Sequence, residues 1–187
     1  MALIVSYAKR ERVNYKGATH HIVTRCNNKK ALIVDDFDFA KYKSILRKAK
    51  EKYGFLLHNY ALMNNHVHLI IRLREILDIS KIMHSINRQY ARWHNEHYDK
   101  KGHFWENRFY GELIEDDVQL LAVMRYIDLN PVKAGLCEKP VEWKHSGAGC
   151  YLQGKQDRLI DAPEVYTDLG KTEEARQRAY SYIFPFK

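Results

Sequence analysis

The segment NYALMNNHVHLIIRL, residues 59–73, carries two histidines inside an apolar run with the character of a β-strand. Because side chains two positions apart in a strand point to the same face, His66 and His68 are expected to project side by side. Two imidazoles placed in this way can hold one divalent metal ion on a rigid support. A pair of surface histidines would show the same spacing, so the triplet alone leaves both interpretations open.

Outward from this segment, the sequence predicts strands that alternate with helices. Asn64-Asn65 separates two strand-like runs and is typical of a hairpin turn. Gly54 is expected to end the preceding helix, and Pro131 to end a later one. The expected strands are 19–26, 31–34, 55–64, 66–73 and 108–114, and the expected helices are 36–53, 78–98, 116–129 and 171–182. With a loop-rich stretch at 135–170, this order favours an α+β domain built on an antiparallel sheet.

The length and composition fit one ordinary globular domain with a short appended tail. The chain has 187 residues, of which 45% are hydrophobic and 29% are charged. Its three cysteines form no CxxC pair, so the sequence indicates neither a zinc finger nor a disulfide framework. It holds no apolar run of about 18 residues, and residues 1–12 lack the apolar segment of a signal peptide. We therefore expect a cytoplasmic protein with no membrane partner.

The positive net charge favours an anionic partner, of which nucleic acid is the most common. The chain carries 31 lysines and arginines against 23 acidic residues, which gives a net charge of +8. On the helix expected at 78–98, one face carries basic side chains three or four positions apart, namely Lys81, His84, Arg88 and Arg92. Such a stripe fits either a solvated helix face or a surface that contacts a phosphate backbone.

A second polar feature lies near the end of the helix expected at 116–129. Tyr126 and Asn130 are four positions apart, and are therefore neighbours on one helix face. The apolar stripe of this helix points largely away from that face, through Leu120, Leu121, Met124 and Ile127. Tyr126 is therefore either an amphipathic residue at the edge of the core or a reactive hydroxyl with room for a substrate.

The histidine pair and Tyr126 together provide the chemical groups needed to cleave a phosphodiester bond. A tyrosine hydroxyl has an ordinary pKa of about 10 and is a weak nucleophile when neutral. A divalent metal ion on His66 and His68 would polarise the scissile phosphate, and Asn130 can supply a third ligand beside Tyr126. Imidazole and amide oxygen suit Mn²⁺ somewhat better than Mg²⁺. The product would be a covalent phosphotyrosine, which keeps the bond energy for rejoining without ATP.

Four blocks of the sequence resemble a known family. Besides residues 59–73, they are THHIVTRCNN at 19–28, GHFWENRFY at 102–110 and RYIDLNPVKAGL at 125–136. Together they cover most of residues 15–150 in the order found in the small single-tyrosine HUH transposases. The last block resembles the tyrosine-bearing helix of the REP-associated tyrosine transposase branch, so the likeness is far more specific than the histidine triplet.

The resemblance implies a ferredoxin-like antiparallel sheet flanked by helices, and it implies a reaction. His66 and His68 correspond to the metal ligands, with Mg²⁺ or Mn²⁺ as the ion, and Tyr126 corresponds to the nucleophile. Asn130 stands where a polar residue, often glutamine in other branches, completes the metal site. Family members join the tyrosine to a 5′ phosphate and free a 3′ hydroxyl, on DNA hairpins with single-stranded flanks. The implied setting is the bacterial cytoplasm, in association with the nucleoid.

With this resemblance, the basic stripe is expected to face DNA. The expected DNA-binding residues are Lys81, Arg88, Arg92, Trp105, Arg108 and Lys133. Arg108 and Lys133 are expected to flank the site, whereas Trp105 fits base stacking and core packing equally well. Tyr90, on the helix with the basic stripe, is the second candidate nucleophile.

The resemblance implies a division of the chain into two regions, and at three places the sequence differs from the family pattern. Residues 1–150 correspond to the transposase-like domain, and residues 151–187 form a C-terminal extension with a short terminal helix. Cys26 replaces a common glycine, Asn64 a common proline, and Ser146-Gly147 a common Ser-Ser pair. These differences concern the shape of loops and contacts with DNA, and none falls on the expected metal ligands or nucleophile.

The sequence is also compatible with three other functions. A related HUH nickase, such as a replication initiator or relaxase, would use the same residues, but the chain is short for one. A hydrolase that activates water on the histidine-bound metal would retain activity in Tyr126→Phe. A domesticated DNA- or RNA-binding protein without catalysis would bind hairpins and form no covalent adduct. Either a monomer or a homodimer fits the resemblance, and a monomer is favoured.

Overall fold

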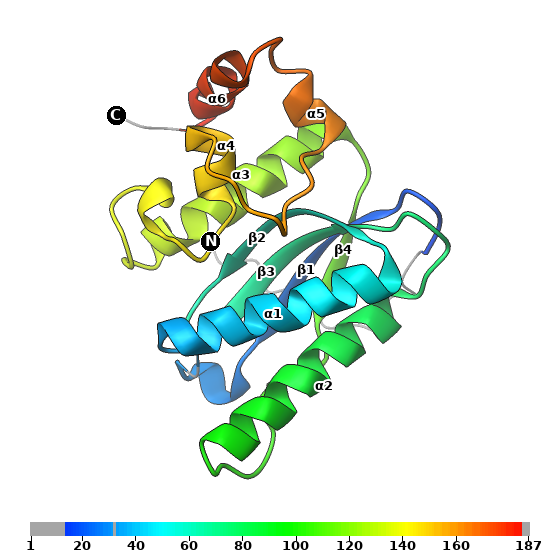
Figure 1. Ribbon diagram of the computed structural model, residues 1–187, viewed down its shortest axis with the longest axis vertical. Coiled ribbons are helices and arrows are strands. Elements are labelled where there is room, and N and C mark those ends of the chain that lie inside the picture. The colour runs from blue at the N-terminus through cyan, green and yellow to red at the C-terminus, as the bar shows by residue number, and fades with distance from the viewer. Residues whose placement is uncertain (1–13, 32, 185–187) are drawn as a thin grey trace, which may run out of the picture.

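A four-stranded antiparallel sheet forms the centre of the computed structural model, which describes residues 14–31 and 33–184 (Figure 1). The strands, in the spatial order β2-β3-β1-β4, are β1 (Thr19–Arg25), β2 (Leu56–Leu62), β3 (His66–Arg72) and β4 (Tyr110–Ile114). The helices are α1 (Asp36–Tyr53), α2 (Ile79–His97), α3 (Asp117–Lys133), α4 (Ala148–Gln153), α5 (Glu164–Thr167) and α6 (Glu173–Tyr182), with 3-10 turns at Asn27–Lys29 and Pro140–Glu142. The β-α-β-β-α-β order of the first elements is that of a ferredoxin-like core, which confirms the predicted α+β class.

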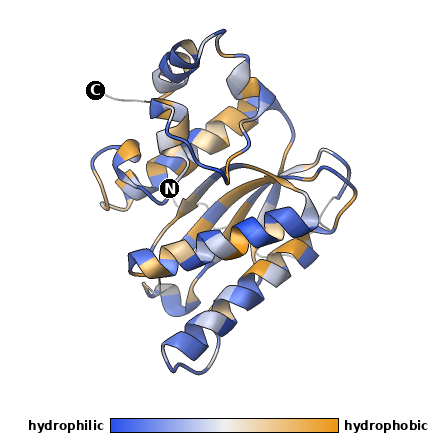
Figure 2. Ribbon diagram, viewed as in Figure 1, coloured by the Kyte–Doolittle hydropathy of each residue, from blue (hydrophilic) through white to orange (hydrophobic). Residues whose placement is uncertain are grey.

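The sheet packs helices on both of its faces. One face, which includes Leu69, lies against α1 and α2, the two helices in front of the sheet in Figure 1. The other face contributes Ile70 to a second apolar cluster with α3 and the C-terminal helices. Figure 2 accordingly shows hydrophobic colours along the strands and hydrophilic stretches on α2. Because side chains alternate along a strand, His66 and His68 lie on the face of Ile70, toward α3.

Helix α1 and the β2–β3 hairpin agree with the sequence prediction. Asp35 caps the N-terminus of α1, since its side chain accepts a hydrogen bond from the backbone N–H of Asp38 at 2.8 Å. Gly54 ends the helix in a left-handed conformation with φ 66°, which a residue without a Cβ adopts at little cost. Asn64 and Asn65 form the turn between the two strands, as expected.

The expected end of α3 at Pro131 is wrong. The helix continues for two more residues to Lys133, with Pro131 inside it. A proline removes one helical hydrogen bond, because its nitrogen has no hydrogen to donate to the fourth residue before it. This loss is tolerated here because Pro131 lies in the last turn, where few further hydrogen bonds depend on the helical path.

The strand expected at 31–34 is not formed by the described residues of that segment. Asn28 adopts a left-handed conformation with φ 54°, which interrupts the extended path of the chain after β1. Ile33 donates a backbone hydrogen bond of 3.0 Å to Asn64, next to the hairpin turn, without building a ladder. Residue 32 lies outside the described residues, as does the segment 1–12 that was expected to lack a signal peptide.

Two further expectations concern the cysteines and the membrane. The cysteines Cys26, Cys137 and Cys150 are free thiols, in agreement with the absence of a disulfide pattern. Across residues 14–31 and 33–184, the structure contains no helix with the length and apolar character needed to cross a membrane.

The C-terminal part of the chain packs against α3. The stretch expected to be rich in loops, 135–170, holds only short helices, and α6 falls within the helix expected at 171–182. Three tyrosines from α4, α5 and α6, namely Tyr151, Tyr166 and Tyr180, are buried with the apolar residues of α3 in the second cluster. This part of the chain therefore supports the helix that carries Tyr126.

A buried carboxyl group lies at the centre of this contact. Asp128 of α3 accepts hydrogen bonds from Asn59 Nδ2 of β2 at 2.9 Å and from the Tyr180 hydroxyl of α6 at 2.8 Å. Burial raises the pKa of Asp128 to about 7, and the two hydrogen bonds act in the opposite direction without cancelling this effect. Polar contacts thus tie α3 to the sheet on one side and to α6 on the other.

Asp128→Asn is expected to change the pH dependence of stability. The folded pKa lies above the ordinary value of 3.8, so protonated Asp128 stabilises the fold below about pH 4, and this contribution is lost as pH rises through about 7. The free energy of unfolding of wild type minus that of the variant should therefore fall by about 4 kcal/mol between pH 4 and pH 8. Urea unfolding across this range measures it, with Asp117→Asn, an exposed acid of the same helix, as the control. A difference that does not vary with pH would contradict the expectation.

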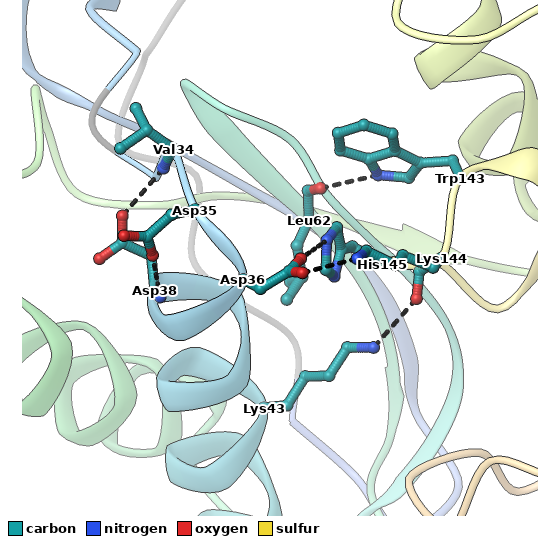
Figure 3. A network of polar contacts seen from close by, with 9 residues as sticks. All are labelled: Val34, Asp35, Asp36, Asp38, Lys43, Leu62, Trp143, Lys144 and His145. Carbon is teal, nitrogen blue, oxygen red and sulfur yellow. Dashed lines mark hydrogen bonds and ion pairs between the residues drawn. The ribbon is translucent and has the colours of Figure 1, made fainter.

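The loop after α3 is fixed to α1 and β2 by a second polar network (Figure 3). Lys144 Nζ lies 2.7 Å from one carboxylate oxygen of Asp36, and His145 Nε2 lies 3.2 Å from the other. The indole N–H of Trp143 donates to the backbone carbonyl of Leu62 at 3.0 Å. The chain therefore leaves α3 along a defined path, which limits the positions that α3 can take.

Candidate active site

The two histidines of β3 lie side by side, as their spacing predicted. The ring centroids of His66 and His68 are 4.9 Å apart, with the rings at an interplanar angle of 79°. His66 Nδ1 lies 2.6 Å from the side-chain oxygen Oδ1 of Asn65. Because this oxygen can only accept, His66 Nδ1 carries the proton and its Nε2 presents a lone pair.

A third histidine, which the sequence analysis did not single out, joins this pair. His21 of β1 places its Nε2 atom 3.1 Å from Nδ1 of His68, and the two rings are stacked at 5.3 Å and 13°. On the same face of β1, Arg25 pairs directly with His66 in the antiparallel register, and its side chain is exposed. Alternation in residues 19–25 puts His21 and Arg25 on one face, but only the register with β3 brings them to the site.

Burial keeps all three imidazoles neutral at pH 7. It lowers the pKa of His21 to about 4, and together with the charge of Arg25 it lowers the pKa of His66 to about 4. The pKa of His68 falls well below 6.5, through burial first and then through the neighbouring His66, His21 and Arg25. Each neutral ring has one nitrogen with a lone pair, which is the form that binds metal ions.

Helix α3 brings Tyr126 to the histidines. Its ring lies edge-on to His68 with a centroid distance of 5.7 Å, and edge-on to His21 at 6.0 Å. The residue is 44% exposed, so its side chain is open to a substrate from solvent. Lys133 Nζ lies 5.1 Å from the centre of the Tyr126 ring and adds a positive charge next to it. The structure thus places the tyrosine, two histidines of one strand and an exposed cation in one site.

Asn130 also lies on the Tyr126 face of α3, where its side-chain Nδ2 donates to the Tyr126 carbonyl at 2.7 Å. The other atom of this amide, Oδ1, is a neutral oxygen of the kind that Mg²⁺ and Mn²⁺ accept. No group of three His, Cys, Asp or Glu side chains suited to a metal ion occurs among the described residues. An ion held by His66, His68 and Asn130 would meet two imidazole nitrogens and one amide oxygen, a set of donors that suits a divalent ion.

Tyr90, the second candidate nucleophile, is excluded by its position. It is fully buried in the α2 side of the core, where its ring packs on Tyr42 at a centroid distance of 5.1 Å. Burial also raises the pKa of its hydroxyl well above the ordinary range, which disfavours the reactive anion. A hydroxyl in that environment cannot reach a phosphate in solvent.

The basic stripe of α2 does not lie at the tyrosine site. Lys81, Arg88 and Arg92 are exposed on α2, which packs on the face of the sheet opposite to the histidines. They line a hollow of about 1360 Å³, to which α1 adds two further lysines, Lys48 and Lys52. The sequence predicted an exposed basic face, but helical periodicity does not tell on which side of a sheet a helix packs.

The remaining expected DNA-binding residues divide between the two faces. Lys133 lies against Tyr126, as expected, whereas Arg108 lines the hollow on the α2 side. Trp105 also lines this hollow, but its indole N–H donates to the backbone carbonyl of Asn87 at 2.8 Å. Its ring packs on the Phe104 ring at 4.6 Å, so core packing accounts for most of the Trp105 side chain.

The sheet is ferredoxin-like, its histidines lie next to each other, and a tyrosine faces them from the helix after the last strand. This combination defines the single-tyrosine proteins with an HUH motif, in which the two histidines of a strand are separated by one hydrophobic residue. The family model described as "Transposase IS200 like" matches residues 14–130. The chain therefore belongs to the IS200-like transposase family, which confirms the resemblance seen in the sequence.

The chain is also similar to two named proteins. A Haemophilus influenzae protein named as a REP-associated tyrosine transposase is 29% identical over 116 residues, which cover 57% of this chain. The match spans 66% of that relative's length. A solved structure of a REP-associated tyrosine transposase bound to a REP hairpin aligns with a TM-score of 0.68 at 22% identity. It covers 84% of this chain and 93% of the other, and at this identity the likeness concerns the fold.

Proposed function

We propose that this protein cleaves and rejoins single-stranded DNA at hairpin elements through a covalent link to Tyr126. The observation that carries the proposal is the position of the Tyr126 ring, 5.7 Å from His68 on the neighbouring strand. An exposed tyrosine close to neutral histidines has both access to a phosphate and neighbours suited to a metal ion. Membership in the IS200-like transposase family supports the same reaction.

In the proposed reaction, the Tyr126 oxygen attacks a backbone phosphorus atom. The bond from phosphorus to the 3′ oxygen breaks, a bond from phosphorus to the tyrosine oxygen forms, and the phenolic proton leaves to solvent. The departing 3′ oxygen takes up a proton, so the products are a 5′-phosphotyrosine and a 3′ hydroxyl. Attack by a 3′ hydroxyl on the phosphotyrosine reverses these steps and rejoins the DNA.

The residues around Tyr126 would bind the metal ion and stabilise negative charge during this reaction. His66, His68 and Asn130 would hold Mg²⁺ or Mn²⁺, which when bound polarises the scissile phosphate. Lys133 stabilises negative charge on the Tyr126 oxygen as its proton leaves. Because Tyr126 contacts histidines of its own chain, we propose that a monomer contains a complete site.

We propose that hairpin DNA contacts the basic α2 face, and that its unpaired flank reaches the tyrosine site. The solved relative is bound to a REP hairpin, and the net charge of +8 favours an anionic partner. The hollow on α2 is lined by exposed cations that can contact a phosphate backbone. Arg108 lines this hollow and stands two residues before the edge strand β4 in the sequence.

The double variant Lys81→Glu/Arg88→Glu is expected to weaken hairpin binding about tenfold or more at 0.15 M salt. The slope of log K against log salt should fall in magnitude by about two, because two phosphate contacts are lost. Fluorescence anisotropy with a labelled hairpin over a salt series measures both values. Lys171→Glu, which changes an exposed lysine just before α6, is the control and should behave like wild type. If the double variant keeps the hairpin affinity and the salt dependence of wild type, α2 is not part of the DNA interface.

One experiment tests the function as a whole. Wild-type protein is incubated with Mn²⁺ and labelled single-stranded hairpins from the DNA that flanks its own gene, and the products are separated on an SDS gel. An SDS-resistant band with the nucleotide located on Tyr126 by mass spectrometry is the expected result. Nicked DNA without an adduct would favour hydrolysis by water, and bound, uncut DNA would favour a non-catalytic binding protein.

A further inference from the structure

His21 stands out because it contacts a proposed metal ligand and has no part in the reaction described so far. It is only 7% exposed, and its Nε2 atom lies 3.1 Å from Nδ1 of His68. The antiparallel register pairs Val23 with His68, so His21 is the diagonal neighbour of His68 on the same sheet face. The contact therefore follows from the pairing of β1 with β3.

The chemistry of the contact restricts both rings. A neutral imidazole has one N–H and one nitrogen with a lone pair, so one of the two facing nitrogens must donate and the other accept. If His21 donated, His68 would carry its own proton on Nε2 and could not bind a metal ion there. If His68 donates from Nδ1, its Nε2 lone pair is free. Only the second arrangement is compatible with His68 as a ligand.

The same logic already applies to His66. Its Nδ1 faces the side-chain oxygen of Asn65 at 2.6 Å, an oxygen that can only accept. The Nε2 atom of His66 is therefore the one with the lone pair. With His68 oriented by His21, both histidines would present Nε2, each held in place through Nδ1.

We propose that His21 is a positioning residue that accepts the Nδ1 proton of His68 and so directs the Nε2 lone pair of His68 to the metal ion. The inference rests on the proposed function, since it takes His68 as a metal ligand. In this arrangement His21 accepts the Nδ1 proton of His68, just as the side-chain oxygen of Asn65 accepts the Nδ1 proton of His66. Groups that orient a ligating imidazole in this way commonly change metal affinity by about 10- to 100-fold.

Metal affinity in two variants of His21 tests the proposal without any DNA reaction. His21→Phe keeps an aromatic ring against Tyr126 and His68 but has no acceptor. His21→Gln offers a carbonyl oxygen near the position of Nε2. Electron paramagnetic resonance of free Mn²⁺ should show about 10- to 100-fold weaker binding for His21→Phe and binding within about threefold of wild type for His21→Gln. His103→Phe, at an exposed histidine, is the matched control.

The wild-type protein provides a second test that needs no variant to fold. Long-range proton–nitrogen NMR spectra identify which ring nitrogen of each histidine carries the proton. With Mg²⁺ bound, His68 should be protonated on Nδ1 and His21 should have a bare Nε2. A proton on Nε2 of His68 in that state would overturn the assignment of His21.

The outcomes separate this inference from the proposed function. Wild-type affinity in His21→Phe would overturn the role of His21 and leave the metal site intact. Equal loss in His21→Phe and His21→Gln would also overturn it, because ring packing rather than the acceptor would then matter. If wild type binds no Mn²⁺, the metal site itself fails, and the role of His21 fails with it.

Discussion

Tyr126→Phe is expected to abolish the covalent adduct while the protein still folds and binds hairpin DNA. The substitution removes only the hydroxyl, and the remaining ring can keep its edge-on contacts with His21 and His68. Since the residue is 44% exposed, no fully buried polar group is lost. Removal of a nucleophile lowers the rate by at least about 10³-fold, which puts the adduct below detection on an SDS gel.

Controls for this variant follow from the positions of the other tyrosines. Tyr182 on α6 is 79% exposed, and Tyr182→Phe should form the adduct like wild type. Anisotropy should give both variants the hairpin affinity of wild type. An adduct of normal yield in Tyr126→Phe would exclude Tyr126 as the nucleophile, and mass spectrometry would then locate the reacting residue.

His66→Ala and His68→Ala should each slow metal-dependent cleavage by about 100-fold or more, with hairpin affinity within about threefold of wild type. The reason is that each variant removes one of two imidazoles that are neutral and adjacent. His66 is only partly buried, whereas His68→Ala also leaves the buried His21 without its hydrogen-bond partner. His68→Ala should therefore cost about 1 to 3 kcal/mol of stability as well, and His66→Ala is the cleaner probe.

Single-turnover cleavage over a range of Mn²⁺ concentrations measures this effect. Higher Mn²⁺ should restore part of the activity of His66→Ala, because one imidazole and Asn130 remain. His97→Ala, at an exposed histidine in the last turn of α2 and outside the hollow, is the control and should cleave at the wild-type rate. Normal cleavage by both His66→Ala and His68→Ala would refute the metal site and leave the Tyr126 proposal to stand alone.

Local patterns in the sequence were sufficient for much of the fold. The cap at Asp35 and the stop at Gly54 bound α1 where the spacing of apolar residues predicted it. The alternation around His66 and His68 placed both on one face of β3, as the structure shows. These features depend on neighbours within a few positions, which is why the sequence alone could predict them.

What the sequence could not predict depends on contacts between distant residues. His21 reaches the site only through the register of β1 with β3, forty-seven positions away in sequence from His68. Arg88 has the periodicity of an exposed residue, but that periodicity is the same on either side of a sheet. Asp128 is charged by type, and its position in the core depends on Asn59 and Tyr180, two distant residues that provide its hydrogen bonds.

The contact between Tyr180 and Asp128 has a consequence for the timing of synthesis. The proposed catalytic residues are all translated by residue 133, but the helix that carries Tyr126 gains its contact with α6 only with residue 180. A nascent chain, or a copy truncated by a frameshift after residue 150, would contain every reactive group and lack the packing that aligns them. Strand cutting would thus begin only after α6 has been synthesised, so that copies of the gene interrupted before α6 yield products that cannot break DNA.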